Sequence, residues 1–245
     1  MSILGVCVDA MNPFGGPKPA DLGQLQWVRQ VAFPGPTVAE YFFQLHMAGF
    51  DTALVLGLES LGEDQSQWAS LARGYVRTCR PSVVVVGNEM DAYLLGVPSP
   101  SSWSLRPPRY RQLVGEVMKG LNQVHPRPLV IGGGSVSGQP SWWQNVDPAG
   151  LGLDGIDVHP YGKDPAEARQ LLRLYKQYGL PLYVLEWNRP AAEIGAYAQM
   201  LEEEDVQAGC FFCWSEGMVP GFGLVDPNGN PTDEHTQIMA AAAAG

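Results

Sequence analysis

Residues 83–91 read VVVVGNEMD, and residues 181–188 read PLYVLEWN. Each stretch is an apolar run that leads into a glutamate, Glu89 in the first and Glu186 in the second. Runs that are apolar at every position are typical of parallel strands covered on both faces. A charged side chain at the end of such a strand is costly to desolvate unless it has a partner or a chemical role. We therefore predict a parallel sheet with a pair of carboxylates at one edge.

Short β-branched runs alternate with longer amphipathic segments along the chain, the pattern of βα units around a parallel sheet. Strands are predicted at residues 3–10, 26–32, 52–57, 83–87, 129–132, 155–159, 182–186 and 208–214. Helices are predicted at residues 37–48, 65–79, 108–124, 165–178, 191–204 and 233–243. The helices after the first and fifth strands are expected to be abbreviated. Eight strands without a break in composition predict one compact (β/α)8 TIM barrel, a single domain over residues 1–245.

Composition restricts the partners. The formal net charge of -10 and the pI near 4.8 oppose non-specific nucleic-acid binding, which depends on Lys and Arg. No apolar run reaches the roughly 20 residues that span a bilayer, so no membrane partner is expected. The four cysteines lie in or beside apolar segments, which favours buried free thiols. We expect a monomer without a cofactor, either cytoplasmic or secreted with a leader removed.

In a (β/α)8 barrel the chemistry lies at the carboxyl ends of the strands, where the βα loops converge. Polar or aromatic residues that close the predicted strands are therefore candidates for one mouth: Asp9, Arg29, Asn88, Glu89, His159, Tyr161, Glu186 and Trp214. The run Gly132-Gly133-Gly134 follows the fifth strand and is explained by close backbone approach near the site. The loops after strands four and five add Trp103 and Trp142 as expected platforms for a sugar ring.

Hydrolysis of a glycosidic bond needs one carboxylic acid to protonate the leaving oxygen and a second carboxylate to attack or to activate water. With Asn88-Glu89 after strand four and Glu186 at the end of strand seven, the chain resembles the clan A glycoside hydrolases. The motifs QWVRQVAF, IDVHPYG and CFFCWSEGM resemble the family-5/39-like members of that clan. They supply Arg29 near the end of strand two, His159-Pro160-Tyr161 after strand six, and Trp214 at the end of strand eight.

The resemblance implies a retaining glycosidase that acts by double displacement on a β-linked poly- or oligosaccharide. Glu89 would be the acid/base, protonated in the free enzyme. Glu186 would be the ionised nucleophile, stabilised by Arg29 and by the Tyr161 hydroxyl. A retaining mechanism needs the two carboxyl groups roughly 5 to 5.5 Å apart.

The other motif residues would bind or position substrate. Asn88 would donate a hydrogen bond to the sugar 2-hydroxyl, His159 would orient a carboxylate, and Trp214 would stack on the sugar. The resemblance also implies a cis peptide at Trp214-Ser215.

Two other functions fit parts of this pattern. In a metal-dependent sugar isomerase, Glu89, His159 and Glu186 would bind a divalent cation, although an arginine beside that cation is electrostatically unfavourable. A non-catalytic carbohydrate-binding barrel would keep the fold and lack the reaction. The glycosidase hypothesis requires no metal.

Overall fold

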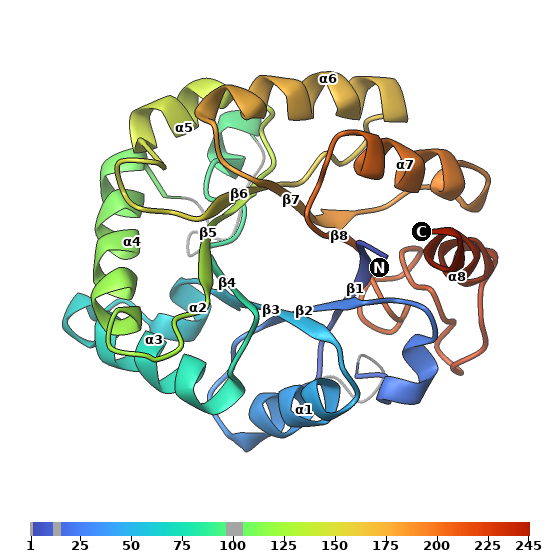
Figure 1. Cartoon of the computed structure of the whole chain (residues 1–245), viewed down its shortest axis with the longest axis horizontal. Helices are drawn as coiled ribbons and strands as arrows, with labels where there is room; N and C mark the ends of the chain where they lie inside the picture. The colour runs from blue at the N-terminus through green and yellow to red at the C-terminus, as the bar shows by residue number, and fades with distance from the viewer. Residues whose placement is uncertain (1, 12–15, 97–104) are drawn as a thin grey trace.

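The computed structural model describes residues 2–11, 16–96 and 105–245. Within these residues, eight parallel strands close into a barrel in chain order, with β1 hydrogen-bonded to both β2 and β8 (Figure 1). The strands are β1 (Leu4–Val8), β2 (Trp27–Val31), β3 (Asp51–Leu56), β4 (Val83–Val86), β5 (Leu129–Ser135), β6 (Gly155–Val158), β7 (Leu182–Trp187) and β8 (Gly209–Phe211). The predicted (β/α)8 TIM barrel is confirmed.

Helices surround the barrel on its outside (Figure 1). The α-helices are α1 (Pro36–Met47), α2 (Leu58–Leu61), α3 (Gln65–Cys79), α4 (Pro107–Leu121), α5 (Pro140–Val146), α6 (Pro165–Tyr175), α7 (Ala191–Glu203) and α8 (Asp233–Ala244). Three 3-10 helices are described as well: η1 (Pro19–Leu22), η2 (Ala92–Leu95) and η3 (Lys176–Tyr178). Both abbreviations are confirmed, because the described residues between β1 and β2 hold only η1, and α5 has seven residues. No helix of the described residues is long and apolar enough to cross a membrane.

Strand β4 shows why its sequence is apolar at every position. Side chains alternate across a strand, so Val83 and Val85 belong to the cluster inside the barrel, whereas Val84 and Val86 belong to the larger cluster beneath the helices. All four valines are fully buried. The sheet therefore separates two apolar layers, and its polar groups are left to the ends of the strands.

The cysteines follow the prediction. Cys7, Cys79, Cys210 and Cys213 are all buried and free. Three of them, Cys7, Cys210 and Cys213, pack inside the barrel. Burial raises the pKa of Cys213 to about 11, so this thiol is not a reactive thiolate at neutral pH.

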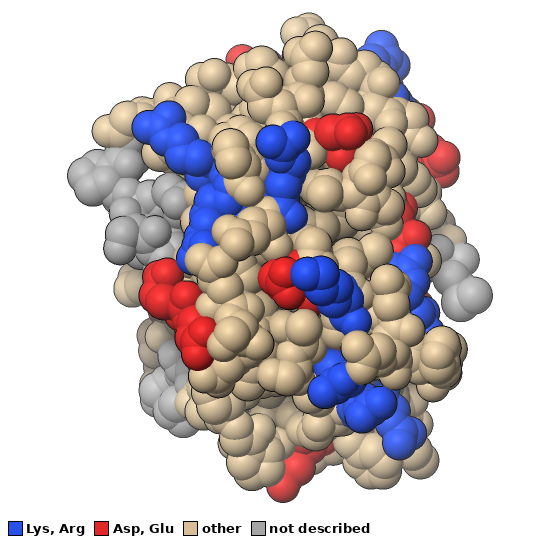
Figure 2. All heavy atoms as spheres, turned by 90° about the vertical axis from the view of Figure 1, so that its left-hand side faces the viewer, with Lys and Arg blue, Asp and Glu red and all other residues tan. Residues whose placement is uncertain are grey.

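The outer surface carries charges of both signs. Figure 2 shows the left-hand side of Figure 1, where basic and acidic side chains are interspersed. One exposed pair on α4 is Lys119 with Glu116, at 2.6 Å. Such surface pairs contribute about 0–1 kcal/mol each, so the barrel depends on its two apolar layers for stability.

Candidate active site

Glu186 lies at the end of β7 and is held by one side chain from β2 and two from the loop after β6. Arg29 of β2 places Nη2 2.5 Å from Oε1, and the Tyr161 hydroxyl donates a hydrogen bond of 2.7 Å to Oε2. Nδ1 of His159 lies 3.7 Å from Oε2. Burial by itself would raise the pKa of Glu186, but the charges of Arg29 and His159 and the Tyr161 bond hold it below its ordinary value. Glu186 is therefore a stabilised carboxylate.

His159 follows β6 and stands between carboxylates. Its Nε2 lies 3.0 Å from Oδ2 of Asp157, whose other oxygen accepts the Leu185 backbone N–H at 2.8 Å. Burial would lower the pKa of His159, but Glu186 and Asp157, together with the hydrogen bond to Glu89, raise it to about 10. At neutral pH the ring is an imidazolium that donates from both nitrogens.

The glycine run, which lies within β5 and not after it as predicted, makes room for this ring. A Cβ on Gly134 would lie 2.1 Å from Nε2 of His159, and one on Gly133 would lie 2.1 Å from the carbonyl oxygen of Gly87. The close backbone approach expected of these glycines is therefore present. It lets the end of β5 pass beside both His159 and the loop that carries Glu89.

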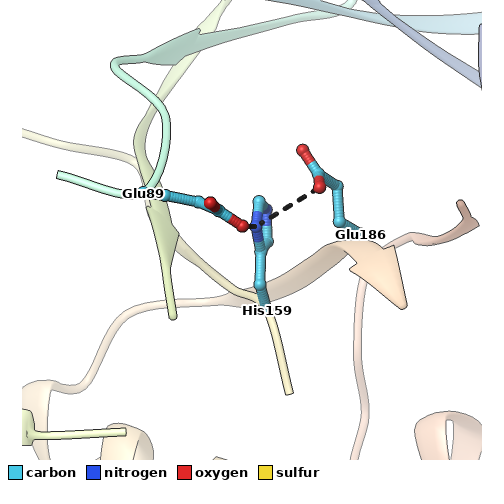
Figure 3. Close-up of side chains that lie close together, drawn as sticks. All are labelled: Glu89, His159 and Glu186. Atoms are coloured by element: carbon cyan, nitrogen blue, oxygen red, sulfur yellow. Dashed lines mark hydrogen bonds and ion pairs between the residues drawn. The ribbon is translucent and has the colours of Figure 1, made fainter. Parts of the chain in front are cut away.

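Glu89 reaches His159 from the opposite side to Glu186 (Figure 3). It lies in the loop after β4, and its Oε1 is 3.2 Å from Nδ1 of His159. The side chain is 18% exposed, against 8% for Glu186. The backbone of Glu89 has a φ of 48°, the left-handed region that non-glycine residues seldom adopt. A ligand atom of each of Glu89, His159 and Glu186 lies within 4.8 Å of the other two.

Asn88 connects the two sides of the mouth. Nη2 of Arg29 donates a hydrogen bond of 2.8 Å to the Asn88 side-chain oxygen, so one guanidinium binds both Asn88 and Glu186. Burial would lower the pKa of Arg29, but the negative charge of Glu186 raises it above its ordinary range. The arginine therefore keeps its charge. Because the Asn88 side-chain oxygen accepts from Arg29, the side-chain nitrogen of Asn88 is the atom that can donate to a substrate.

These groups open into one cavity of about 860 Å³ at the carboxyl ends of the strands. Five of the predicted site residues line it: Arg29, Asn88, Glu89, Tyr161 and Glu186. His159 is buried beneath it, with 1% of its surface exposed. The structure therefore brings these six residues together at one mouth.

The predicted tryptophans are placed differently. Trp214 lines a separate hollow beside His235, with ring centroids 6.0 Å apart, so it is not a platform over Glu186. Trp142 is also misassigned, because it is 3% exposed and packs against Tyr110 and Trp143. Trp103 lies outside the described residues.

Phe212 takes the place that the sequence assigned to Trp214. The sheet part of β8 ends at Phe211, after which the Cys213 N–H binds the Phe222 carbonyl and the Trp214 N–H binds the Cys7 carbonyl. Phe212 lines the cavity, and its ring centroid is 6.3 Å from that of Tyr161. The cis peptide is likewise at Phe212-Cys213, and the prediction of Trp214-Ser215 is wrong.

Asp157 and Asp91 are two further polar residues of the site, and sequence reasoning missed both. Asp157 is the one acid inside the apolar strand β6, two positions before His159, and residues two apart face the same side. Asp91 accepts hydrogen bonds from the backbone N–H groups of Val136 and Ser137, at 2.9 and 3.2 Å. It joins the loop of Glu89 to the loop after β5. Glu59 of α2 also lines the cavity and gave no signal, because it does not end a strand.

The chain is similar to solved structures of carbohydrate-active barrels. A beta-glucuronidase from Bacteroides uniformis is 14% identical with a TM-score of 0.71, covering 98% of this chain and 35% of its own. A GH128 (subgroup VII) oligosaccharide-binding protein from Trichoderma gamsii has 14% identity and a TM-score of 0.68, and the match covers 99% of this chain and 94% of that protein. A xylanase from Cellvibrio japonicus has 10% identity and a TM-score of 0.66, and the match covers 99% of this chain and 98% of the xylanase.

The chain has the fold of these proteins. It spans about a third of the glucuronidase chain and nearly the whole of the other two. No family model matches the sequence, and no curated protein matches it. At 10–14% identity the likeness establishes the barrel, and the chemistry has to be argued from the residues at its mouth.

Proposed function

We propose that this chain is a retaining clan A glycoside hydrolase that cleaves a β-linked poly- or oligosaccharide by double displacement. The observation that carries the proposal is the approach of Glu89 and Glu186 to one histidine, with oxygens within 4.8 Å of each other. Carboxyl groups about 5 to 5.5 Å apart suit a covalent intermediate, whereas inverting enzymes separate them by about 6.5 to 9.5 Å to admit a water. The short separation favours retention.

In the first step, the Glu186 carboxylate attacks the anomeric carbon while Glu89 transfers its proton to the leaving glycosidic oxygen. The glycosidic bond breaks, an ester bond to Glu186 forms, and the leaving sugar departs with the proton. Arg29 and Tyr161 keep Glu186 ionised and fix its orientation for the attack.

In the second step, Glu89 takes a proton from water, and the resulting hydroxide displaces Glu186 from the anomeric carbon. His159 donates a hydrogen bond to Glu89 and so orients this carboxyl group for both proton transfers. This use of one histidine accounts for its position between the two glutamates.

The substrate would be held by the remaining cavity residues. Asn88 can donate its amide to the sugar 2-hydroxyl, and Phe212 offers an apolar face beside Glu186. The neighbouring folds support a carbohydrate ligand, because they include a glucanase, xylanases and a structure in complex with xylotetraose. The assignment to a family-5/39-like group remains a prediction.

A metal-dependent sugar isomerase is the first rival, because Glu89, His159 and Glu186 bring three ligand atoms together. Their partners argue against it. Oε1 of Glu186 is already bound by Arg29, and a divalent cation would stand beside that guanidinium and the imidazolium. Hydrolysis that persists in a strong chelator would exclude this rival.

A carbohydrate-binding barrel without activity is the second rival, since one similar structure is an oligosaccharide-binding protein. The approach of both glutamates to His159, Glu89 at 3.2 Å and Glu186 at 3.7 Å, favours a reaction. Binding of glycans with no hydrolysis of any of them would favour this rival.

The test of the proposal is Glu186→Gly with an activated aryl β-glycoside. We expect it to be inactive alone and to be rescued by azide, which attacks the open face and gives the glycosyl azide of inverted configuration. The wild-type enzyme should give product of retained configuration by NMR. Hydrolysis that survives in Glu186→Gly without azide would overturn the double-displacement assignment.

A further inference from the structure

Glu59 is a third carboxylate in the cavity that holds Glu89 and Glu186, and the mechanism above does not use it. It belongs to α2, the short helix that follows β3. On this side of the cavity it shares the wall with Val31 and Phe33, which lie at the end of β2 and just beyond it. Glu89 comes from β4 and Glu186 from β7, so Glu59 is supplied by a different part of the barrel.

The carboxylate of Glu59 has few partners for its degree of burial. Among the described residues, its one hydrogen bond is with its own backbone N–H. Arg29 is the nearby charge, but its Nη2 is already bound to Glu186 and Asn88. Burial raises the pKa of Glu59. Because a partly buried carboxylate normally has donors, a ligand would complete this one.

Other buried acids of the protein are satisfied. Asp91 accepts from Ser135, Val136 and Ser137, and Glu204 is bound by Arg173 and Lys176. Glu59 therefore differs from the acids that have a structural function. Glu59 lines the cavity, whereas the oxygens of Asp91 and Glu204 are used within the protein.

Gly57 shapes the position of this carboxylate. A Cβ on Gly57 would lie 2.3 Å from Oε1 and 2.4 Å from Oε2 of Glu59. The φ of Gly57 is -111°, which any residue can adopt, so its lack of a side chain matters for space rather than for backbone freedom. The side chain of Glu59 folds back over its own backbone only because this space is open.

We propose that Glu59 accepts hydrogen bonds from two neighbouring hydroxyl groups of a neutral sugar unit and so determines which sugar the site takes. This inference rests on the proposed function. An ionised carboxylate has only acceptors, so it pairs with hydroxyl donors, and Phe33 supplies an apolar surface for the C–H face of a ring. A uronic acid would bring a second negative charge to Glu59 and is disfavoured. Arg189, the other cation lining the cavity, is already engaged by Glu193.

The experiment measures binding and hydrolysis separately. Cellobiose, xylobiose and laminaribiose are titrated into the wild-type protein and Glu59→Gln by calorimetry, and the 4-nitrophenyl β-glycosides of the same disaccharides are used for kcat and KM. Loss of the charge-assisted bonds in Glu59→Gln should weaken binding of the preferred disaccharide about tenfold. In the kinetics this loss should appear as a higher KM. Glu63→Gln is the matched control, because Glu63 is exposed and lies nearby in the chain. It should behave as wild type.

Gly57→Ala provides a second variant, in which Glu59 is kept but displaced. It should show the same loss of binding with an unchanged circular dichroism spectrum. Wild-type affinity in Glu59→Gln would overturn the inference even if hydrolysis is intact, and so would failure of all three disaccharides to bind the wild-type protein. Tighter binding of a cationic amino-sugar disaccharide would also overturn it. If binding falls in Glu59→Gln while the wild-type protein hydrolyses nothing, the inference stands and the proposed hydrolysis fails.

Discussion

Glu186 and Glu89 are the same residue type at the same mouth, but their surroundings differ. Glu186 ends a strand, is 8% exposed, and is bound by Arg29 and Tyr161. Glu89 lies in a loop and is 18% exposed. Among the described residues, its side chain is hydrogen-bonded to His159. The first environment fixes a charge and a position, whereas the second leaves a carboxyl group in reach of solvent. On this difference we base the proposal that Glu186 attacks and that Glu89 exchanges protons.

The strongest test of this comparison is Glu186→Gln. Because the amide cannot form the covalent intermediate, kcat should fall by about 10⁴-fold or more on every substrate, whatever its leaving group. Steady-state kinetics with aryl glycosides of different leaving-group ability measure this. If the loss of kcat in Glu186→Gln disappeared with a good leaving group, Glu186 would be the acid/base and Glu89 the nucleophile.

Glu89→Gln should have the smaller and more selective effect. We expect kcat to fall by about 10² to 10⁴ with a poor leaving group that needs protonation. With an activated leaving group the first step should be nearly unaffected, so a burst of released phenol is expected before slow turnover. Stopped-flow absorbance would detect the burst, and equal losses on both substrate types would contradict a proton-transfer role.

Asp157→Asn tests the imidazolium that joins the two glutamates. Asn keeps an oxygen for the Leu185 N–H but removes the charge beside His159, so activity should fall about tenfold. In the wild-type protein the folded state binds the His159 proton more tightly than the unfolded chain does. The resulting stability is present in full below pH 6.5 and is lost as the pH rises towards about 10.

Thermal unfolding from pH 6 to pH 10 measures this dependence. The decrease in melting temperature over that range should be clearly smaller in Asp157→Asn than in the wild-type protein. An identical slope in both proteins would show that Asp157 does not control the charge of His159.

The smallest expected effect separates Phe212 from Trp214. Phe212→Ala should raise KM about three- to tenfold because it removes the apolar face beside Glu186. Trp214→Ala should lower the melting temperature with little change in KM, since its ring packs near His235 and is 7% exposed. The reverse pattern would restore the original assignment of Trp214.

The sequence was sufficient for the barrel and for six residues of its mouth. Apolar runs such as Val83–Val86 specify strands buried on both faces, and the polar residues that end them must meet where parallel strands end. Arg29, Glu89 and Glu186 could therefore be placed together without coordinates. This part of the site depends on periodicity and chain order alone.

Only the tertiary structure decided which neighbouring residue faces the cavity. Strand β8 ends at Phe211, before the predicted end at residue 214, and that early end presents Phe212 to the site and turns Trp214 away. Glu59 likewise reaches the cavity from the short helix α2 and not from the end of a strand, so no strand pattern records it. The physical reason is that local pattern sets an element and its faces, whereas packing between distant segments sets where each element stops and what its last side chains touch.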